Sequence, residues 1–377
     1  MTPEIKHRIE KIRRGNVPDG YKKTKAGILP ADWDVHMLGE CLSRVEKPVE
    51  VKPNKLYTQI GIRSHGKGIF YKEPVTGAAL GNKSVFWIEP DCFIVNIVFA
   101  WEQAIGKTTQ SEVGMIGSHR FPMYRPVNDR VDIDYLISYF LTKRGTDILE
   151  AASPGGAGRN KTLGQDRFLK SKITLPPIEE QRKIAAILTT QDRVIELKEK
   201  RLAEKQRQKK YLMQQLLTGK KRLPGFAFEV EKTNIKAIST YSVSTISQTM
   251  LESYEGKQLY PVFNANSIAG HVDFYENECP YISIIKDGAG IGRVRLCEAK
   301  SSTIGTMGCI HARKGISIIF LYYLLEQVDF NKYSNGSTIP HLYYKDYSCE
   351  KVRIPDIKEQ AAIAEVLSTA DREIELL

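Results

Sequence analysis

The strongest constraint on the fold of this 377-residue chain is an internal repeat. Residues 175–197 read LPPIEEQRKIAAILTTQDRVIEL, and residues 354–376, which lie 179 positions later, read IPDIKEQAAIAEVLSTADREIEL. Thirteen of the 23 aligned residues are identical, far more than unrelated segments share. Self-similarity of this kind indicates a duplicated structural unit. We therefore expect two copies of one fold in the chain.

The repeated segment predicts the start of a long helix. Pro177 suits a first helical turn, Glu179 and Glu180 complement the helix dipole, and neither Pro nor Gly follows until Gly219. A helix over residues 178–218 would be about 60 Å long. Apolar residues recur at seven-residue spacing, which predicts pairing with the helix of the second copy or docking of another subunit. The residues expected to serve this role are Ile184, Leu188, Ile195, Leu202, Leu212 and Leu216, together with Ile363, Leu367 and Ile374. A solvated connector helix is the alternative.

The charge of the chain favours a polyanionic partner. Lys and Arg number 55 against 44 Asp and Glu, a formal net charge of +11. Ten of these cations lie in residues 198–222, against two Glu. Such an excess points to nucleic acid before a membrane, although a solubilising surface explains a basic helix equally well.

Several classes of protein are excluded or disfavoured by the remaining composition. The longest apolar runs, residues 92–101 and 316–325, are far shorter than the roughly 20 residues of a membrane span. Six scattered cysteines form no C-x-x-C pair and seven histidines show no ligand spacing, so we expect no metal and no disulfide scaffold. The N-terminus lacks a signal peptide, and cytoplasmic localisation is the expectation.

Two mixed segments separate the predicted helices. Each contains short β-branched and aromatic runs such as residues 84–88 and 281–285, then an apolar helical stretch (132–142 and 316–327), then a polar Gly-containing loop (155–161 and 335–340). The prediction is a mixed α/β (α+β) fold: two similar globules joined by long antiparallel coiled-coil helices, with pseudo-two-fold internal symmetry. The expected domains are an N-terminal helical segment (1–20), a first globule (21–175), a central long helix (176–222), a second globule (223–354) and a shorter second helix (355–377).

These features together resemble the specificity subunit of type I restriction–modification systems. The resemblance is carried by Leu29-Pro30-x-x-Trp33, by Leu38-Gly39-Glu40, by the paired loops and by the P-x-I-x-E-Q-x-x-I-A-x-x-L helix starts. It implies a non-catalytic subunit without a cofactor, whose two target-recognition domains each read one half of a split double-stranded DNA site. It also implies helices that dock two methyltransferase subunits and, through them, the restriction and translocase subunits. The second helix is shorter than the first, and residues 5–14, helical in pattern, are expected to substitute in part for its missing half.

Reading base edges and phosphates requires polar and cationic side chains on loops that enter a groove. The candidates in the first segment are Arg63, Ser64, His65, Lys67, Lys107, Thr108, His119, Arg120, Arg159, Asn160 and Lys161. Those in the second segment are Asn264, Asn266, Lys286, Arg293, Arg295, His311, Arg313, Asn335, Ser337, Thr338 and His341.

Two other functions stay open at this point. Asp287, Glu298 and Lys300 match the loose D-x(10)-E-x-K pattern of Mg-dependent nucleases, whose carboxylates hold the metal. A scaffold protein built on a duplicated helix hairpin, without DNA binding, is the other alternative. Neither an Asn-Pro-Pro-aromatic methyltransferase motif nor a G-x-x-x-x-G-K-[ST] nucleotide loop occurs, so catalysis of methyl transfer or ATP hydrolysis by this chain is not expected.

Overall fold

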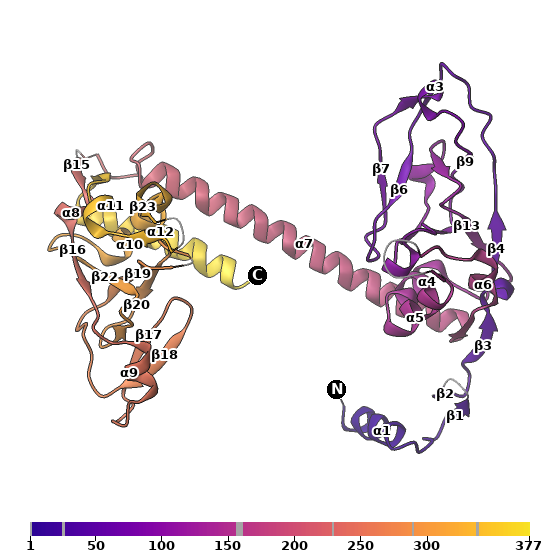
Figure 1. The fold of residues 1–377 in the computed structure, drawn as a ribbon, viewed down its shortest axis with the longest axis horizontal. Coiled ribbons are helices and arrows are strands. Elements are labelled where there is room, and N and C mark those ends of the chain that lie inside the picture. The colour runs from indigo at the N-terminus through magenta and orange to yellow at the C-terminus, as the bar shows by residue number, and fades with distance from the viewer. Residues whose placement is uncertain (1, 25–26, 156–160, 228–229, 289, 337–338) are drawn as a thin grey trace. The chain divides into compact units, whose positions relative to one another are not determined.

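The computed structural model describes residues 2–24, 27–155, 161–227, 230–288, 290–336 and 339–377 (Figure 1). The chain divides into a first unit, residues 1–195, and a second unit, residues 196–377. The boundary falls inside one long helix, α7 (Ile178–Leu216), so each unit contains part of it. The predicted domain limits are finer than this division and stay predictions.

The first unit is built around a four-stranded antiparallel sheet. Its strand order is β11 (Ile105–Lys107), β10 (Phe93–Val95), β13 (Met123–Pro126) and β4 (Leu42–Val45). All three residues of β10 are buried, as expected for an apolar central strand. The helices beside the sheet are α2 (Leu38–Cys41), α4 (Ile133–Phe140), α5 (Lys143–Ala151) and α6 (Gln165–Lys170). Phe93, Tyr124, Phe140 and Phe168 form the aromatic centre of the core.

Two smaller parts surround this sheet. The first part contains α1 (Pro3–Arg13), which has no buried residue, and the paired strands β1 (Tyr21–Thr24) and β2 (Gly27–Pro30). The next strand, β3 (Asp34–Met37), pairs with β14 (Lys172–Leu175). Between β4 and β10 lies an insertion whose elements are β5 (Leu56–Tyr57), β6 (Ile60–Ile62), β7 (Ile69–Tyr71), β8 (Val75–Thr76), α3 (Gly77–Leu80) and β9 (Val85–Trp87). With β12 (Ile116–Ser118) it forms a small separate core around Tyr57 and Leu80.

The second unit repeats the same scaffold. Its antiparallel sheet has the order β16 (Ser239–Val243), β22 (Met307–Ala312), β19 (Tyr281–Ile285) and β20 (Val294–Cys297). A strand pair, β15 (Glu231–Asn234) with β25 (Lys351–Ile354), matches β3 with β14. The helices are α8 (Ile235–Ile238), α10 (Ile318–Glu326), α11 (Tyr344–Tyr347) and α12 (Ile357–Glu375), and two short strands, β23 (Ser334–Asn335) and β24 (His341–Leu342), pair before α11.

The insertions distinguish the two copies. Between β16 and β19 the second unit has α9 (Gln248–Glu252), β17 (Tyr260–Phe263) and β18 (Ile268–Val272), and β17 also pairs with β21 (Ser302–Thr303). In the first unit the corresponding places hold the β6–β7 hairpin and β12, which meet only at one parallel bridge, Gln59 with Ile116, and β12 pairs with β9 instead. The predicted duplication is therefore confirmed for the sheet and its flanking helices, whereas the inserted segments differ.

The predicted long helix and its antiparallel pairing are confirmed in the second unit. α7 runs without a break for 39 residues, about 58 Å at 1.5 Å per residue. Its last two turns pack on α12, where Leu216, Ile363 and Leu367 share one core. Lys205 lies 2.6 Å from Glu373 and Lys209 lies 2.6 Å from Asp371, so the two helices run antiparallel.

The first half of α7 corrects part of the predicted pairing. Leu188 and Ile195 are 41% and 54% exposed, so no described residue covers them. The described contacts of α12 and the residues after it lie further along α7, where Lys205 pairs with Glu373 and Lys198 donates to the Leu377 carbonyl. Of the remaining predicted positions, Ile184, Leu202, Leu212 and Ile374 are partly buried. None of the described helices is long and apolar enough to cross a membrane.

Candidate nucleic-acid interface

In the first unit, the candidate loops gather on the connection between β10 and β11, residues 96–104. The β6–β7 hairpin loop binds it through three contacts: the His65 N–H donates to the Glu102 carbonyl (2.7 Å), the Gly66 N–H to the Gln103 carbonyl (2.9 Å) and the Ser64 hydroxyl to the Glu102 carboxylate (2.9 Å). His65 and Gly66 both have positive φ, which turns the hairpin back over this connection.

Two further loops meet the same connection. The Ile97 N–H donates to the Arg120 carbonyl at 3.0 Å, and the Leu163 N–H donates to the Ile97 carbonyl at 2.8 Å. The structure thus brings the predicted loops 63–67, 119–120 and 161 together on residues 96–104, which we call the first hub. Arg159 and Asn160 lie outside the described residues.

The side chains on the first hub are cationic and exposed. Arg63, His65 and Lys67 alternate with partly buried neighbours, and His119 and Arg120 are exposed at the turn after β12. The Arg63 guanidinium lies 4.9 Å from the Phe70 ring centroid, and the Lys161 ammonium lies 5.1 Å from that of Trp101 and 3.8 Å from Glu150. These contacts hold two cations in place while leaving them accessible, as groups that meet a polyanion require.

Lys107 and Thr108 are not part of this surface, which corrects the sequence prediction. Both lie at the end of the β10–β11 hairpin opposite the hub. Thr108 is fully buried: its hydroxyl donates to the Glu89 carbonyl (2.6 Å) and accepts from the Cys92 N–H (3.0 Å). Lys107 pairs with Asp134 at 2.7 Å. Thr108 therefore supports the strand and cannot reach DNA from this position.

The second unit builds an equivalent hub from residues 286–288 and 290–293, between β19 and β20. The Leu342 N–H donates to the Lys286 carbonyl at 2.8 Å, which reproduces the Leu163–Ile97 bond of the first unit. The Gly288 N–H donates to the Pro340 carbonyl at 3.0 Å. Arg293 donates to the Asn266 side-chain oxygen at 2.9 Å, which adds the β17–β18 loop.

Asp287 organises the cations of the second hub. Its carboxylate lies 2.5 Å from the Lys286 ammonium and 2.8 Å from Nδ1 of His341. Partial burial raises the pKa of Asp287, but the hydrogen bonds from Lys286 and His341 outweigh that effect and hold the pKa below its usual value. The carboxylate is therefore ionised at neutral pH and holds both side chains at the surface.

This geometry does not support the nuclease alternative. Asp287 lies at the loop end of the β19–β20 hairpin, whereas Glu298 and Lys300 follow Cys297 at its opposite end. Among the described residues, no group of three acidic, His or Cys side chains could hold a metal ion. The D-x(10)-E-x-K pattern in the sequence thus does not form a metal site in the structure.

The remaining candidates of the second unit have mixed placements. Asn264 accepts from the backbone N–H groups of Asn266 and Ser267 and thereby shapes its own turn. Arg295 is exposed on β20, 4.5 Å from the Phe263 ring centroid. Asn335 is exposed and donates to the Asp346 carboxylate at 3.2 Å. Ser337 and Thr338 lie outside the described residues.

The placement of His311 and Arg313 also corrects the sequence prediction of DNA-contacting residues. They lie at the end of β22 that is remote from the hub, because the opposite end, Met307, pairs with Ile285. His311 lies beside Tyr281, and burial lowers its pKa, which favours the neutral ring. Arg313 donates to the Ser239 carbonyl at 3.1 Å. Both residues support the end of the sheet that is remote from the hub.

Two aromatic residues were missed by sequence reasoning. Trp101 lies on the first hub beneath Lys161, and Tyr343, 50% exposed, lies next to His341 with the Lys345 ammonium 5.6 Å from its ring centroid. Exposed aromatic rings with adjacent cations are a common means of contacting nucleic acid. The available signal was an aromatic residue two positions before a polar or cationic residue, Gln103 or Lys345.

Comparison with known proteins gives one consistent result. Residues 72–206 and 228–377 match the family model for the type I restriction modification DNA specificity domain. A putative type I restriction enzyme MjaX specificity subunit from Methanocaldococcus jannaschii is 22% identical over 398 aligned residues, covering 95% of this chain and 91% of the relative. The type I restriction enzyme EcoprrI specificity subunit of Escherichia coli is 25% identical over 125 residues, covering 33% of this chain and 31% of that one. The crystal structure of a type I restriction–modification S subunit from M. genitalium shares the fold, with a TM-score of 0.61 at 15% identity over 91% of this chain and 90% of that chain.

Proposed function

This chain belongs to the type I restriction–modification DNA specificity family, and we propose that its two units each read one half of a bipartite double-stranded DNA target. The observation that carries the proposal is the repeated hub. In both units the same scaffold presents loops on the β10–β11 or β19–β20 connection through the same backbone hydrogen bond, but with different side chains. One scaffold with two sets of side chains suits two half-sites of different sequence.

The hubs contain both kinds of group that DNA recognition needs. Arg63, Lys67 and Arg120 in the first unit, and Lys286, Arg293 and His341 in the second, can contact phosphates or the acceptor edge of guanine. Asn266 offers an amide for adenine. Asp287 acts as a positioning group: its carboxylate does not bind DNA but holds the side chains of Lys286 and His341.

The long helix is the proposed docking surface for the partner subunits. Exposed apolar residues on the first half of α7, among them Leu188 and Ile195, lack a cover in the described chain and suit a helical partner. We propose that two methyltransferase subunits bind the helical part of the chain and that restriction and translocase subunits join through them. The chain itself would contribute no catalytic residue and no cofactor, and would act in the cytoplasm.

Mapping of methylated bases tests the proposal. DNA from cells that express this chain with its cognate methyltransferase would be sequenced for modified adenine or cytosine. We expect one split motif with two specified ends and an unspecified spacer of fixed length. A single uninterrupted motif, or methylation without sequence preference, would contradict the proposal that each unit reads one half of the target.

A further inference from the structure

A pair of like charges directly opposite one another marks a second surface on the second unit. In the β15–β25 ribbon, Lys232 is the cross-strand partner of Arg353, and Lys351 lies two residues from Arg353 on the same exposed face. Like charges facing each other across two strands are destabilising. The unfavourable pairing of Lys232 with Arg353 therefore suggests that these cations have a function outside the ribbon.

The duplicated scaffold provides an internal control. In the matching ribbon of the first unit, β3 with β14, Val35 lies opposite Thr174 at the equivalent positions. The scaffold therefore folds with neutral residues at the positions of Lys232 and Arg353, whereas the position of Lys351 holds a cation, Lys172, in the first unit as well. Arg353 donates to the Thr218 carbonyl after α7 at 3.2 Å, whereas no ion pair among the described residues involves Lys232 or Lys351.

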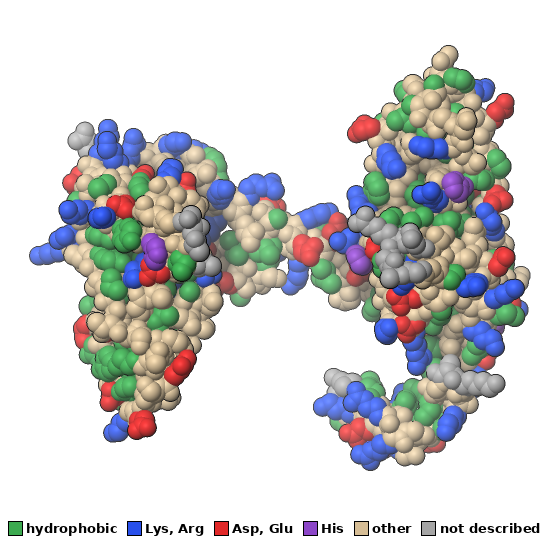
Figure 2. Space-filling view, viewed as in Figure 1, with side chains coloured by type: hydrophobic (Ala, Val, Ile, Leu, Met, Phe, Trp, Pro, Cys, Tyr) green, Lys and Arg blue, Asp and Glu red, His purple; other side chains and the backbone are tan. Residues whose placement is uncertain are grey.

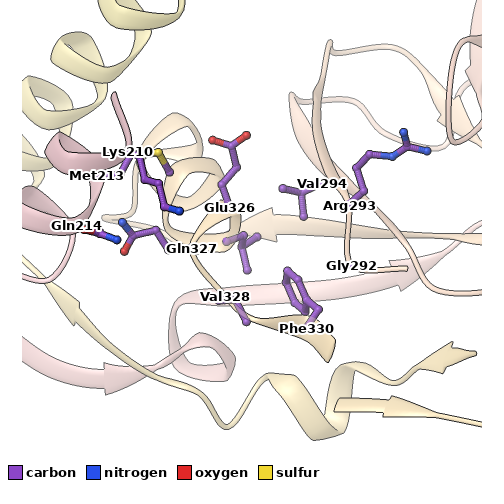
Figure 3. A pocket seen from close by; sticks show the side chains of 11 residues that line it. Lys210, Met213, Gln214, Gly292, Arg293, Val294, Glu326, Gln327, Val328 and Phe330 are labelled. Carbon is purple, nitrogen blue, oxygen red and sulfur yellow. The ribbon is translucent and has the colours of Figure 1, made fainter. Parts of the chain in front are cut away.

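These cations line a groove that is continuous with the second hub. A cavity of about 570 Å³ lies between Lys210 on α7 and Arg293 of the hub (Figure 3), and it shares Gln327 and Val328 with a neighbouring cavity of about 370 Å³. The latter shares Lys351 and Arg353 with a third, of about 600 Å³, which reaches Lys232. We call this connected surface the basic groove, and its cations are Lys210, Lys220, Lys232, Arg293, Lys332, Lys351 and Arg353.

The charge of the basic groove is largely uncompensated. The ion pairs of the described residues in this unit use none of its cations. Three acidic residues also line the groove and offset part of this charge: Glu326, which pairs with Lys209, Glu350, which accepts from the Tyr333 hydroxyl, and Asp329, which caps a short helical turn. Figure 2 shows Lys and Arg side chains gathered over the part of this unit where α7 ends.

We propose that the basic groove binds the phosphate backbone of the DNA flanking the half-site read by the second unit. This inference rests on the proposed function. DNA is favoured over an acidic protein segment because the groove begins at Arg293, which is itself part of the second hub, so one duplex leaving the hub can follow it. Phosphate contacts of this kind add affinity without reading sequence.

The test uses a triple variant, Lys220→Gln, Lys332→Gln and Lys351→Gln, in the full chain assembled with its methyltransferase subunits. All three side chains are exposed, so the fold should be retained. Affinity for a duplex that contains the mapped target and long flanks is measured between about 50 and 200 mM salt. Each lost phosphate contact lowers the slope of log K against log salt by about 0.9, so we expect a decrease of about two to three. The preference for the target over a mutated target should not change.

A matched control is Lys236→Gln, Lys314→Gln and Lys358→Gln, which removes the same charge from exposed positions that do not line the groove. Its salt slope should equal that of the unmodified chain. A normal slope in the groove variant overturns the inference and leaves half-site reading intact. Loss of the methyltransferase subunits with an unchanged slope also overturns it, and assigns the groove to an acidic protein partner. If the unmodified chain shows no target preference, the proposed function itself fails.

Discussion

Gln181 and Gln360 make the same three hydrogen bonds in the two halves of the chain. Each Nε2 donates to the carbonyl five residues earlier, at 2.9 Å in both cases, and to a loop carbonyl, Arg130 at 2.9 Å or Gly315 at 3.3 Å. Each Oε1 accepts from the backbone N–H of the N-cap residue of an earlier helix, Asp132 before α4 at 3.0 Å or Ser317 before α10 at 2.9 Å. Both side chains are buried, so this glutamine fastens the start of one helix to the start of another.

The first prediction concerns these two glutamines. Replacing Gln181 or Gln360 by Met keeps a similar volume but leaves an N–H and carbonyls buried without partners, at a cost of about 2–4 kcal/mol. Urea unfolding of each variant, followed separately for each unit, would measure this loss of stability. Gln191→Met, on the exposed face of α7, is the control and should change stability by less than about 0.5 kcal/mol. Equal effects of the buried and the exposed substitutions would show that the shared bonds do not stabilise the units.

The second prediction concerns Tyr347, whose buried hydroxyl has no hydrogen-bond partner among the described residues. Its counterpart in the first unit is Phe168, 179 positions earlier. Tyr347→Phe should therefore stabilise the protein, by about 1 kcal/mol, because it removes an unpaired polar group and keeps the ring contacts with Phe330 and Tyr344.

The same substitution should alter the alkaline pH dependence. Burial, with smaller effects of Tyr241 and Tyr344, raises the pKa of Tyr347 above the ordinary value of 10.0. Above that value the unfolded chain loses the proton while the folded chain keeps it, so stability falls as pH rises. The gain from Tyr347→Phe should be larger at about pH 11 than at about pH 8. An equal gain at both pH values would mean that the hydroxyl reaches water and that folding does not raise its pKa.

The third prediction distinguishes a residue proposed to read DNA, Arg63, from a residue that supports the fold, Thr108. Arg63→Ala should weaken DNA binding or relax the first half-site by about 1–3 kcal/mol while leaving the melting temperature unchanged, because Arg63 is exposed. Thr108→Val should have the opposite profile, a stability loss of about 1–3 kcal/mol with the same DNA motif. Thermal unfolding and selection from a randomised DNA library would distinguish the two. A changed motif in the Thr108 variant would reverse the assignment.

The sequence predicted the elements whose signal is local or repeated. The continuous α7, the apolar helices α4 and α10 and the duplicated scaffold all follow from periodicity and self-similarity. The hubs could not be derived in the same way, because the contacts of Ile97 and Lys286 join segments that lie far apart in the chain. Thr108 reads as a polar loop residue, and only the tertiary fold turns it inward. Leu188 and Ile195 were expected to pair with the second helix or with another subunit, and the periodicity alone could not show that the contacts of α12 fall on a later part of α7.

The central claim is that each unit reads its own half of the DNA site. The most direct test exchanges residues 21–175 for the matching segment of a related specificity subunit and maps methylated bases in cells that contain the cognate methyltransferase. The account predicts that one half of the split motif changes to that of the donor, while the other half stays the same. A motif in which both halves change together, or in which neither changes although the chimera folds and methylates DNA, would contradict it.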